Sequence, residues 1–407
     1  MRDLQEVGLP NNIVAFVGQN ENNALAVACR DVMNLMKPLG YAGHVVNLLE
    51  PQWERRLSAL VNEGVAFAWG NAGIGAKLAI NGKNFWDTLR LPFISVLADQ
   101  PAWMPANHRV CARFVVNGYV FPEYLEVQRR FIRSPQVSTL VPHGLVPNPH
   151  GDRTPWAKRT HRMVFLKSGG DPDALRSEWA AWPVRLRAIL EDICAEALKR
   201  PTGDINGLAL DCFRSHGLEL GERHDLYFAV VQKADLYIRQ VRATLMAKAL
   251  CRVPADIVGA RWDHIDRSQA RARFHPPINA GAVAEFIADT QYLVNTTPNF
   301  DSGSHERVPN GFAARACVVS DDNEYTRKTF RKLPTYFGFD WTDPDWADRL
   351  IERFEDREDY SDLTQPAFEL GAQEFDGSKF MNTLIEIAQL MRFGEQTVRP
   401  FSYDAAA

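Results

Sequence analysis

Apolar and polar positions alternate along the first 150 residues in a way that predicts strands followed by helices. A continuous apolar run over residues 13–17 ends in a glycine, as a fully buried parallel strand would. Helical periodicity follows over 22–36 and again over 53–61. Further apolar runs predict strands over 44–48, 65–69, 93–98, 110–116 and 137–141. This alternation of strands and helices is typical of a doubly wound α/β domain.

A segment rich in proline and glycine, residues 142–152, predicts a boundary between two domains. A new strand over 163–166 follows it, and helical periodicity then runs from 179 to about 250. Later patterns predict strands near 257–259, 273–274, 292–295 and 317–320, with a helix over 282–289. We therefore expect two Rossmann-like α/β domains, an N-terminal one over 1–150 and a C-terminal one over 151–378, the second with a helical insert over about 175–250.

Composition narrows the class of protein. The chain has 407 residues, which favours two domains, and its formal net charge of −4 argues against a nucleic-acid partner. Six scattered cysteines without a Cys-x-x-Cys pair are typical of small buried hydrophobic residues in a reducing compartment. No run approaches the roughly 18 apolar residues of a membrane span, and the N-terminus lacks the apolar region of a signal peptide. We expect a soluble, cytoplasmic protein.

The most informative segment is 295–322, which predicts a strand end, a Ser/Gly loop, a short helix and a second buried strand. Ser304 is expected to cap a helix that runs to about residue 316. The free N–H groups and the dipole of that helix would favour a pyrophosphate. His305 and Arg307 would lie in its first turn, where a guanidinium suits phosphate oxygens. The alternative is an ordinary capped helix with an exposed histidine and arginine.

This segment resembles the C-terminal domain of GT-B glycosyltransferases, most closely the "glycosyl transferases group 1" branch that includes spore-maturation-type proteins. The likeness rests on the pattern Asn-x-x-Pro-Asn-x-x-x-Gly-Ser-His-x-Arg over 295–307, followed by a helix and Ala-Cys-Val-Val-Ser-Asp over 316–321. It extends through Val258-Gly-x-Arg-Trp262 and covers about 250–330, with a looser likeness over 90–170.

The resemblance implies that the C-terminal domain binds a nucleotide diphosphate sugar and the N-terminal domain an unknown acceptor. From the residues themselves we expect no essential metal or other cofactor. It places the diphosphate on Arg307 and the helix start, and Asp321 and Asp322 near the ribose or sugar. It also implies that the C-terminal segment, 379–407, forms a helix that packs back on the N-terminal domain. The chain departs from the family at Asn310, where a glutamate is common, and at Arg315, where a glycine is common.

Two further loops of the C-terminal domain carry positive charge at the expected ends of strands. Lys167, Ser168 and Gly169 directly follow a strand, so a lysine and approachable backbone amides would face a ligand. A simple turn is the alternative there. Arg261 is a further candidate for neutralising phosphate, and the neighbouring Trp262 would either bound a base pocket or pack in the core. The carboxyl ends of parallel strands meet at one edge, so these groups would face the same cleft.

Asp99 and His143 are the candidates for a general base in the N-terminal domain. Asp99 ends an apolar strand, which would aim its carboxylate at an acceptor hydroxyl, although it would equally cap the next turn. His143 lies at the expected domain edge, as a base or as a buried structural histidine. No Asp-x-Asp unit or cluster with metal-ligand spacing is evident, so we expect cationic side chains to stabilise the leaving diphosphate.

Two other functions remain open from the sequence. One is a nucleotide-sugar epimerase on the same fold, which would need no acceptor. The other is a non-catalytic module that binds a sugar nucleotide or a partner protein, suggested by the missing glutamate at Asn310. The donor nucleotide, its sugar, the acceptor and the oligomeric state are not encoded in any pattern that we can interpret.

Overall fold

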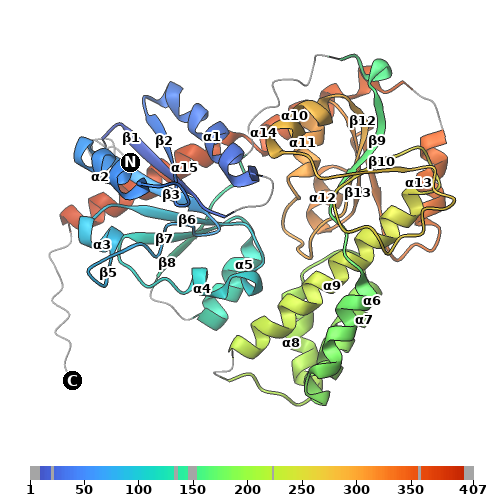
Figure 1. The fold of residues 1–407 in the computed structure, drawn as a ribbon, viewed down its shortest axis with the longest axis horizontal. Helices are drawn as coiled ribbons and strands as arrows, with labels where there is room; N and C mark the ends of the chain where they lie inside the picture. The colour runs from blue at the N-terminus through green and yellow to red at the C-terminus, as the bar shows by residue number, and fades with distance from the viewer. Residues whose placement is uncertain are drawn as a thin grey trace.

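The structure, a computed structural model, describes residues 10–19, 23–132, 136–144, 154–221, 224–355 and 359–397. The chain forms two α/β domains side by side, and a group of long helices projects from the C-terminal domain (Figure 1). Each domain contains a six-stranded sheet in which every neighbouring pair of strands is parallel. The predicted fold class, two Rossmann-like domains with a helical insert in the second, is confirmed.

The N-terminal sheet has the strand order β2-β1-β3-β6-β7-β8. Its central strands are almost fully buried because helices cover both faces, which explains their continuous apolar sequences. The strands are β1 Asn12–Val17, β2 Ala42–Asn47, β3 Val65–Asn71, β6 Phe93–Leu97, β7 Val115–Tyr119 and β8 Val137–Leu140, with a small hairpin of β4 Ala79–Ile80 and β5 Lys83–Asn84. The helices are α1 Ala24–Met36, α2 Trp53–Glu63, α3 Phe85–Leu89, α4 Pro105–His108 and α5 Pro122–Val127.

The C-terminal sheet has the order β11-β10-β9-β12-β13-β14, which in chain order within the domain is the 3-2-1-4-5-6 arrangement of a Rossmann fold. Its strands are β9 His161–Leu166, β10 Asp256–Val258, β11 Arg273–His275, β12 Thr290–Asn295, β13 Cys317–Asp321 and β14 Tyr336–Phe339. The order reverses between β9 and β12. In such sheets the crevice at this reversal, outside the carboxyl ends of the strands, is where ligands bind.

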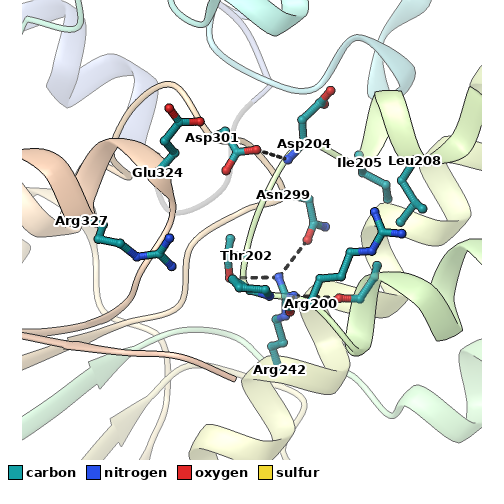
Figure 2. A pocket seen from close by; sticks show the side chains of 13 residues that line it. Arg200, Thr202, Asp204, Ile205, Leu208, Arg242, Asn299, Asp301, Glu324 and Arg327 are labelled. Atoms are coloured by element: carbon teal, nitrogen blue, oxygen red, sulfur yellow. Dashed lines mark hydrogen bonds between the residues drawn. The ribbon is translucent and has the colours of Figure 1, made fainter. Parts of the chain in front are cut away.

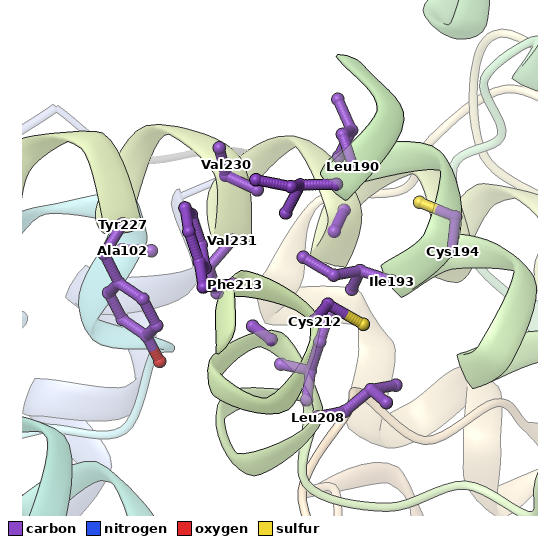
Figure 3. Packing of buried hydrophobic residues seen from close by; sticks show 14 of the residues in the cluster. Ala102, Leu190, Ile193, Cys194, Leu208, Cys212, Phe213, Tyr227, Val230 and Val231 are labelled. Carbon is purple, nitrogen blue, oxygen red and sulfur yellow. The ribbon is translucent and has the colours of Figure 1, made fainter. Parts of the chain in front are cut away.

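The insert between β9 and β10 consists of four helices with a hydrophobic core of their own (Figure 3). They are α6 Pro172–Ser177, α7 Val184–Leu198, α8 Ile205–Ser215 and α9 His224–Leu250. The N-terminal domain completes this core with Ala102, Val127 and Phe131, and the Phe131 ring stacks on Tyr227 at 4.2 Å. The insert is therefore packed against both domains.

The remaining helices cover the C-terminal sheet or return to the N-terminal domain. They are α10 Ala280–Ala288, α11 Arg307–Ala313, α12 Glu324–Thr329, α13 Trp346–Glu355, α14 Gln365–Glu374 and α15 Gly377–Thr397. Helix α15 lies against the N-terminal sheet, where Phe380, Met381 and Leu384 join the core built from β1 and β3 (Figure 1). No helix in the described ranges is long and apolar enough to span a membrane.

Two predicted elements were wrong in their bounds. The strand expected over 110–116 begins only at Val115, because the ladder to β6 starts where Val115 pairs with Phe93. Val110 and Phe114 are buried in the core without being part of that strand, which produced the misleading apolar pattern. The helix expected over 304–316 covers only Arg307–Ala313 and ends before Arg315, whose φ of 53° is left-handed.

Candidate functional site

The loops after β9 and β12 meet at the point where the strand order of the C-terminal sheet reverses. The first loop begins with Lys167, and the second runs from Thr296 to Glu306, just before α11. These loops carry Lys167 and His305, and Arg307 follows as the first residue of α11; all three were expected from the sequence to bind the diphosphate. The fold thus brings the three cationic or potentially cationic groups together at one position.

Arg307 is oriented from beneath by a buried asparagine. Its Nη1 donates to Oδ1 of Asn295 at 2.7 Å, and Asn295 in turn donates to the Ser320 hydroxyl at 2.9 Å. Burial lowers the pKa of Arg307, and within the described residues its guanidinium forms no salt bridge. A guanidinium fixed in orientation but without a salt-bridge partner is suited to an anionic ligand.

Lys167 and His305 experience the same excess of positive charge. Burial holds the pKa of the Lys167 amine well below its usual value, and the charges of Arg239 and Arg307 lower it further. Burial also holds the pKa of His305 well below 6.5, with additional lowering by Arg307 and Lys167. Among the described residues, the Lys167 amine has no hydrogen bond or salt bridge. A bound anion would relieve this repulsion.

The glycines after Lys167 serve mainly the packing of protein segments. A Cβ on Gly169 would lie 2.5 Å from the Trp262 ring and 2.7 Å from the Arg261 carbonyl oxygen. The Trp262 indole is 1% exposed and donates to the Lys167 carbonyl at 3.0 Å, so its role in core packing is the one that the structure shows. Ser168 Oγ accepts from the Ala260 N–H at 3.3 Å. Arg261 itself is exposed beside this loop.

Ser304 does not cap a helix, contrary to the prediction. Its hydroxyl donates to the His305 carbonyl and is buried, while α11 begins at Arg307 with no side-chain cap. His305 therefore precedes the helix, and Arg307 is its first residue. Helix α11 thus begins later than a cap at Ser304 would place it, with Pro309 in its first turn. Asn310 lies one residue beyond Pro309 and is partly exposed.

Asp321 and Asp322 were expected to lie near the ribose or sugar, but their carboxylates are bonded to other residues of the protein. Both are at most 1% exposed. Asp321 accepts from Thr202, from the Thr297 backbone N–H and from the Trp341 indole, at 2.6, 2.7 and 2.8 Å. Asp322 accepts from the Tyr336 hydroxyl at 3.0 Å and pairs with Arg331. Their carboxylates stabilise the loops behind the site.

The two candidate bases occupy different environments. Asp99 follows β6 and remains exposed, yet desolvation by the surrounding protein raises its pKa; Arg239 opposes this effect, and Glu306 adds to it. The His143 ring packs edge-to-face on Phe375 at 5.9 Å and lies near Phe121, and burial lowers its pKa. Asp99 is thus exposed, whereas His143 is packed between aromatic rings.

Three charged residues near these groups were not identified from the sequence as candidates. Glu306 and Asp235 are close enough to affect the pKa of both Asp99 and Lys167, and Arg239 affects these two and His305 as well. We call Asp99, Lys167, Asp235, Arg239, His305, Glu306 and Arg307 the interdomain charge cluster. Glu306 lies inside the motif over residues 295–307. Asp235 and Arg239 lie in the middle of a helix, where no local pattern marks them.

The N-terminal domain binds the loop after β12 directly. Oε1 of Glu123 accepts from the backbone N–H groups of Asp301 and Ser302 at 2.8 and 3.2 Å. The Phe121 ring stacks on Phe300 at 4.2 Å, and a Cβ on Gly303 would lie only 2.5 Å from Phe121. The loop that carries His305 is therefore fitted against both domains.

A separate pocket of about 430 Å³ lies where the insert meets the C-terminal domain (Figure 2). Arg242 forms part of its wall and donates to Thr202 and Asn299 at 3.0 and 3.2 Å. The pocket contains none of the site residues expected from the sequence. Of its acidic residues Asp204, Asp301 and Glu324, the first two accept hydrogen bonds from backbone N–H groups. In the described part of the chain, no group of three or more His, Cys, Asp or Glu side chains is arranged to hold a metal.

The two facing Rossmann-like domains and the returning C-terminal helix define a GT-B fold. No family model matches the sequence, and no curated protein matches it. The structure is similar to AviGT4, a glycosyltransferase involved in avilamycin A biosynthesis, with a TM-score of 0.52 and 9% identity over 94% of this chain and 98% of that chain.

Two other solved structures are similar over nearly their whole length. HepE from Anabaena, in complex with UDP-glucose, gives a TM-score of 0.49 and 11% identity over 95% of this chain and 100% of that chain. Sucrose-phosphate synthase from Thermosynechococcus elongatus gives 0.49 and 10% over the same shares. At these identities the shared property is the fold.

Proposed function

We propose that the chain is a glycosyltransferase that moves a sugar from a nucleotide diphosphate sugar to a hydroxyl group of an acceptor, without a metal ion. The observation that carries the proposal is the pair Lys167 and Arg307, which form no salt bridge among the described residues and lie where the strand order reverses. A diphosphate would supply the missing negative charge at the usual ligand position of such a sheet. The fold shared with the glycosyltransferase AviGT4 supports this function.

In this proposal each side chain has a separate role. Arg307 offers its planar fork to the diphosphate oxygens, and the Lys167 amine adds a mobile charge. His305 acts as a neutral hydrogen-bonding group, because its pKa is held well below 6.5. Arg261 and Asn310 border the donor, and Ser168 and Gly169 shape the loop beneath it. Ser304, Asp321 and Asp322 are left out because their side-chain oxygens already have partners inside the protein.

Asp99 is the proposed general base, in preference to the enclosed His143. It would take the proton of the acceptor hydroxyl as the oxygen bonds to the anomeric carbon. The bond from that carbon to the diphosphate breaks, and its electron pair remains on the diphosphate oxygen. Cationic side chains would stabilise this charge, as a metal ion does in other enzymes. Activity is accordingly expected to persist in EDTA.

Ligand binding is the first test. Addition of UDP, GDP or their sugars at about 100 times the dissociation constant should stabilise the native state by about 2.7 kcal/mol and raise the melting temperature. The corresponding nucleoside monophosphates should have a smaller effect. If no nucleoside diphosphate shifts the melting temperature or produces heat in titration calorimetry, the proposed donor site is wrong.

A second test separates the alternative functions. Slow hydrolysis of a nucleotide sugar without an acceptor, abolished in Asp99→Asn, would support transfer chemistry and exclude a purely binding role. Removal of a general base typically costs about 10²–10⁴-fold in rate. Because the pKa of Asp99 is raised, the rate should fall as pH decreases through that elevated value. Formation of an epimer from the donor alone would instead assign an epimerase.

A further inference from the structure

The long helix α9 of the insert introduces an arginine into the interdomain charge cluster. Arg239 is 28% exposed and pairs with Asp235 of the same helix. It is close enough to Asp99 of the N-terminal domain and to Lys167 and Arg307 of the C-terminal domain to affect their pKa. Burial disfavours its charge, but Asp235, Tyr124 and Asp99 outweigh that effect and raise its pKa. Arg239 therefore stays cationic in the place where Lys167 and Arg307 already repel each other.

Helix α9 touches both loops of the proposed donor site. A Cβ on Gly170, in the loop that follows Lys167, would lie 3.1 Å from the side-chain amide carbon of Gln240, the neighbour of Arg239. Asp235 accepts from Nδ2 of Asn299 at 2.9 Å, and Arg242 donates to Oδ1 of the same asparagine at 3.2 Å. Arg239 thus lies between residues of α9 that contact the two loops at the strand-order reversal.

The bonding of Asp235 leaves Arg239 only loosely held. Oδ2 of Asp235 accepts from the Trp103 indole of the N-terminal domain at 2.8 Å and from Nη1 of Arg239 at 3.4 Å. Asp235 is the only salt-bridge partner of Arg239 among the described residues. A carboxylate shared by Trp103, Asn299 and Arg239 fixes the position of α9 and leaves guanidinium donors of Arg239 for another anion.

We propose that Arg239 is a third cation for the diphosphate of the donor, supplied by the insert, and that Asp235 is the residue that positions it. This inference rests on the proposed function. In the transfer step Arg239 would stabilise the electron pair that the breaking sugar–oxygen bond leaves on the diphosphate. Because Asp235 also binds Trp103, docking of the insert on the N-terminal domain helps to hold the third cation in place.

The test compares nucleoside diphosphates with monophosphates. Dissociation constants of UDP, GDP, UMP and GMP are measured by calorimetry for the full chain and for Arg239→Gln, Arg239→Lys and Arg307→Gln. Arg214→Gln is the matched control, because Arg214 lies on α8 and forms a surface pair with Asp211. We expect Arg239→Gln to weaken diphosphate binding about tenfold or more, the effect of one charge-assisted hydrogen bond, with monophosphate binding nearly unchanged. Arg239→Lys should restore part of the loss.

Asp235→Asn separates positioning from folding. It keeps the side-chain shape but removes the charge, so the ratio of diphosphate to monophosphate affinity should fall less than in Arg239→Gln while the circular dichroism spectrum is unchanged. An unaltered ratio in Arg239→Gln, with a reduced ratio in Arg307→Gln, would overturn the inference and leave the proposed function intact. If the unmodified chain binds no nucleoside diphosphate, the proposed function fails, and the inference fails with it.

Discussion

Arg307 at the start of α11 and Arg239 on the helix α9 belong to the same charge cluster, but they are held in different ways. Arg307 is fixed from within the C-terminal domain: Asn295 orients its guanidinium, and in the preceding loop Asn323 donates to the carbonyl groups of Phe300 and Gly303 at 3.0 and 2.9 Å. Helix α9 is also bonded to the N-terminal domain, through Trp103 and Asp235. Arg307 is therefore preorganised, whereas the position of Arg239 depends in part on how the two domains are docked.

Replacement of Arg307 by alanine is the strongest test of the preorganised cation. Charge-assisted hydrogen bonds contribute about 1.5–3 kcal/mol each, so affinity for a nucleoside diphosphate should fall by roughly 10- to 150-fold. Calorimetric titration would measure the loss. Arg349→Ala is the control, because Arg349 is exposed on α13 and pairs with Asp343. A loss equal to that of Arg239→Gln would remove the distinction between a preorganised and a docking-dependent cation.

Gly303→Ala tests whether the loop is also constrained by the N-terminal domain. The new methyl group would lie 2.5 Å from the Phe121 ring, and that ring is stacked on Phe300 and has little freedom to move. Overpacking of this kind costs about 1–3 kcal/mol, measured by urea unfolding. In Gly394→Ala, a helical control, the added Cβ meets no described atom within 4 Å, so it should be neutral or stabilising. Equal stability of both variants would show that the loop is free of Phe121.

Lys167 offers a test of the repulsion within the cluster. Because its free pKa is held well below 10.5, part of the amine is neutral at alkaline pH, and a bound diphosphate should raise that pKa. Binding should therefore take up protons, and affinity should fall as pH rises through the lowered value. Calorimetry in buffers of different ionisation enthalpy measures the uptake. Above pH 7 His305 of the unliganded protein is neutral, since its own pKa is held well below 6.5.

Lys167→Arg supplies the control for this linkage. Arginine remains charged at all relevant pH values. The variant should therefore still bind the diphosphate, but without taking up protons at alkaline pH. Proton release on binding by the unmodified chain would contradict the proposed diphosphate contact.

The fold was predictable because its buried strands are also the apolar runs of the sequence. Strands such as β1 and β3 are buried on both faces, so they are continuous apolar runs that end in polar loops. The predicted strand bounds were wrong where residues are buried without pairing to a neighbouring strand, as Val110 and Phe114 are. Arg315 shows another limit, because its left-handed φ ends α11 at a residue that does not favour that conformation.

The site was only partly predictable, for a reason that Arg307 and Arg239 make clear. Arg307 follows a strand and a Ser/Gly loop, so its local sequence places it at a sheet edge. Arg239 lies within a helix of 27 residues, where an arginine near a ligand has the same local pattern as one in solvent. Conversely, Asp321 and Asp322 have the polar sequence of an exposed loop, but both are buried. Asp321 accepts a hydrogen bond from Thr202, and Asp322 pairs with Arg331. Only tertiary packing decides these cases.

The smallest expected effect concerns the outer contact of the insert with the N-terminal domain. Arg109 pairs with Asp225 at 2.6 Å, but these side chains are 39% and 84% exposed. Pairs of this kind contribute about 0–1 kcal/mol, so Arg109→Ala should change the melting temperature and diphosphate affinity very little. Trp103→Phe, which removes the buried hydrogen bond to Asp235, should weaken diphosphate binding more than Arg109→Ala does, without altering monophosphate binding. Equal effects of the two variants would mean that docking of α9 does not act through Asp235.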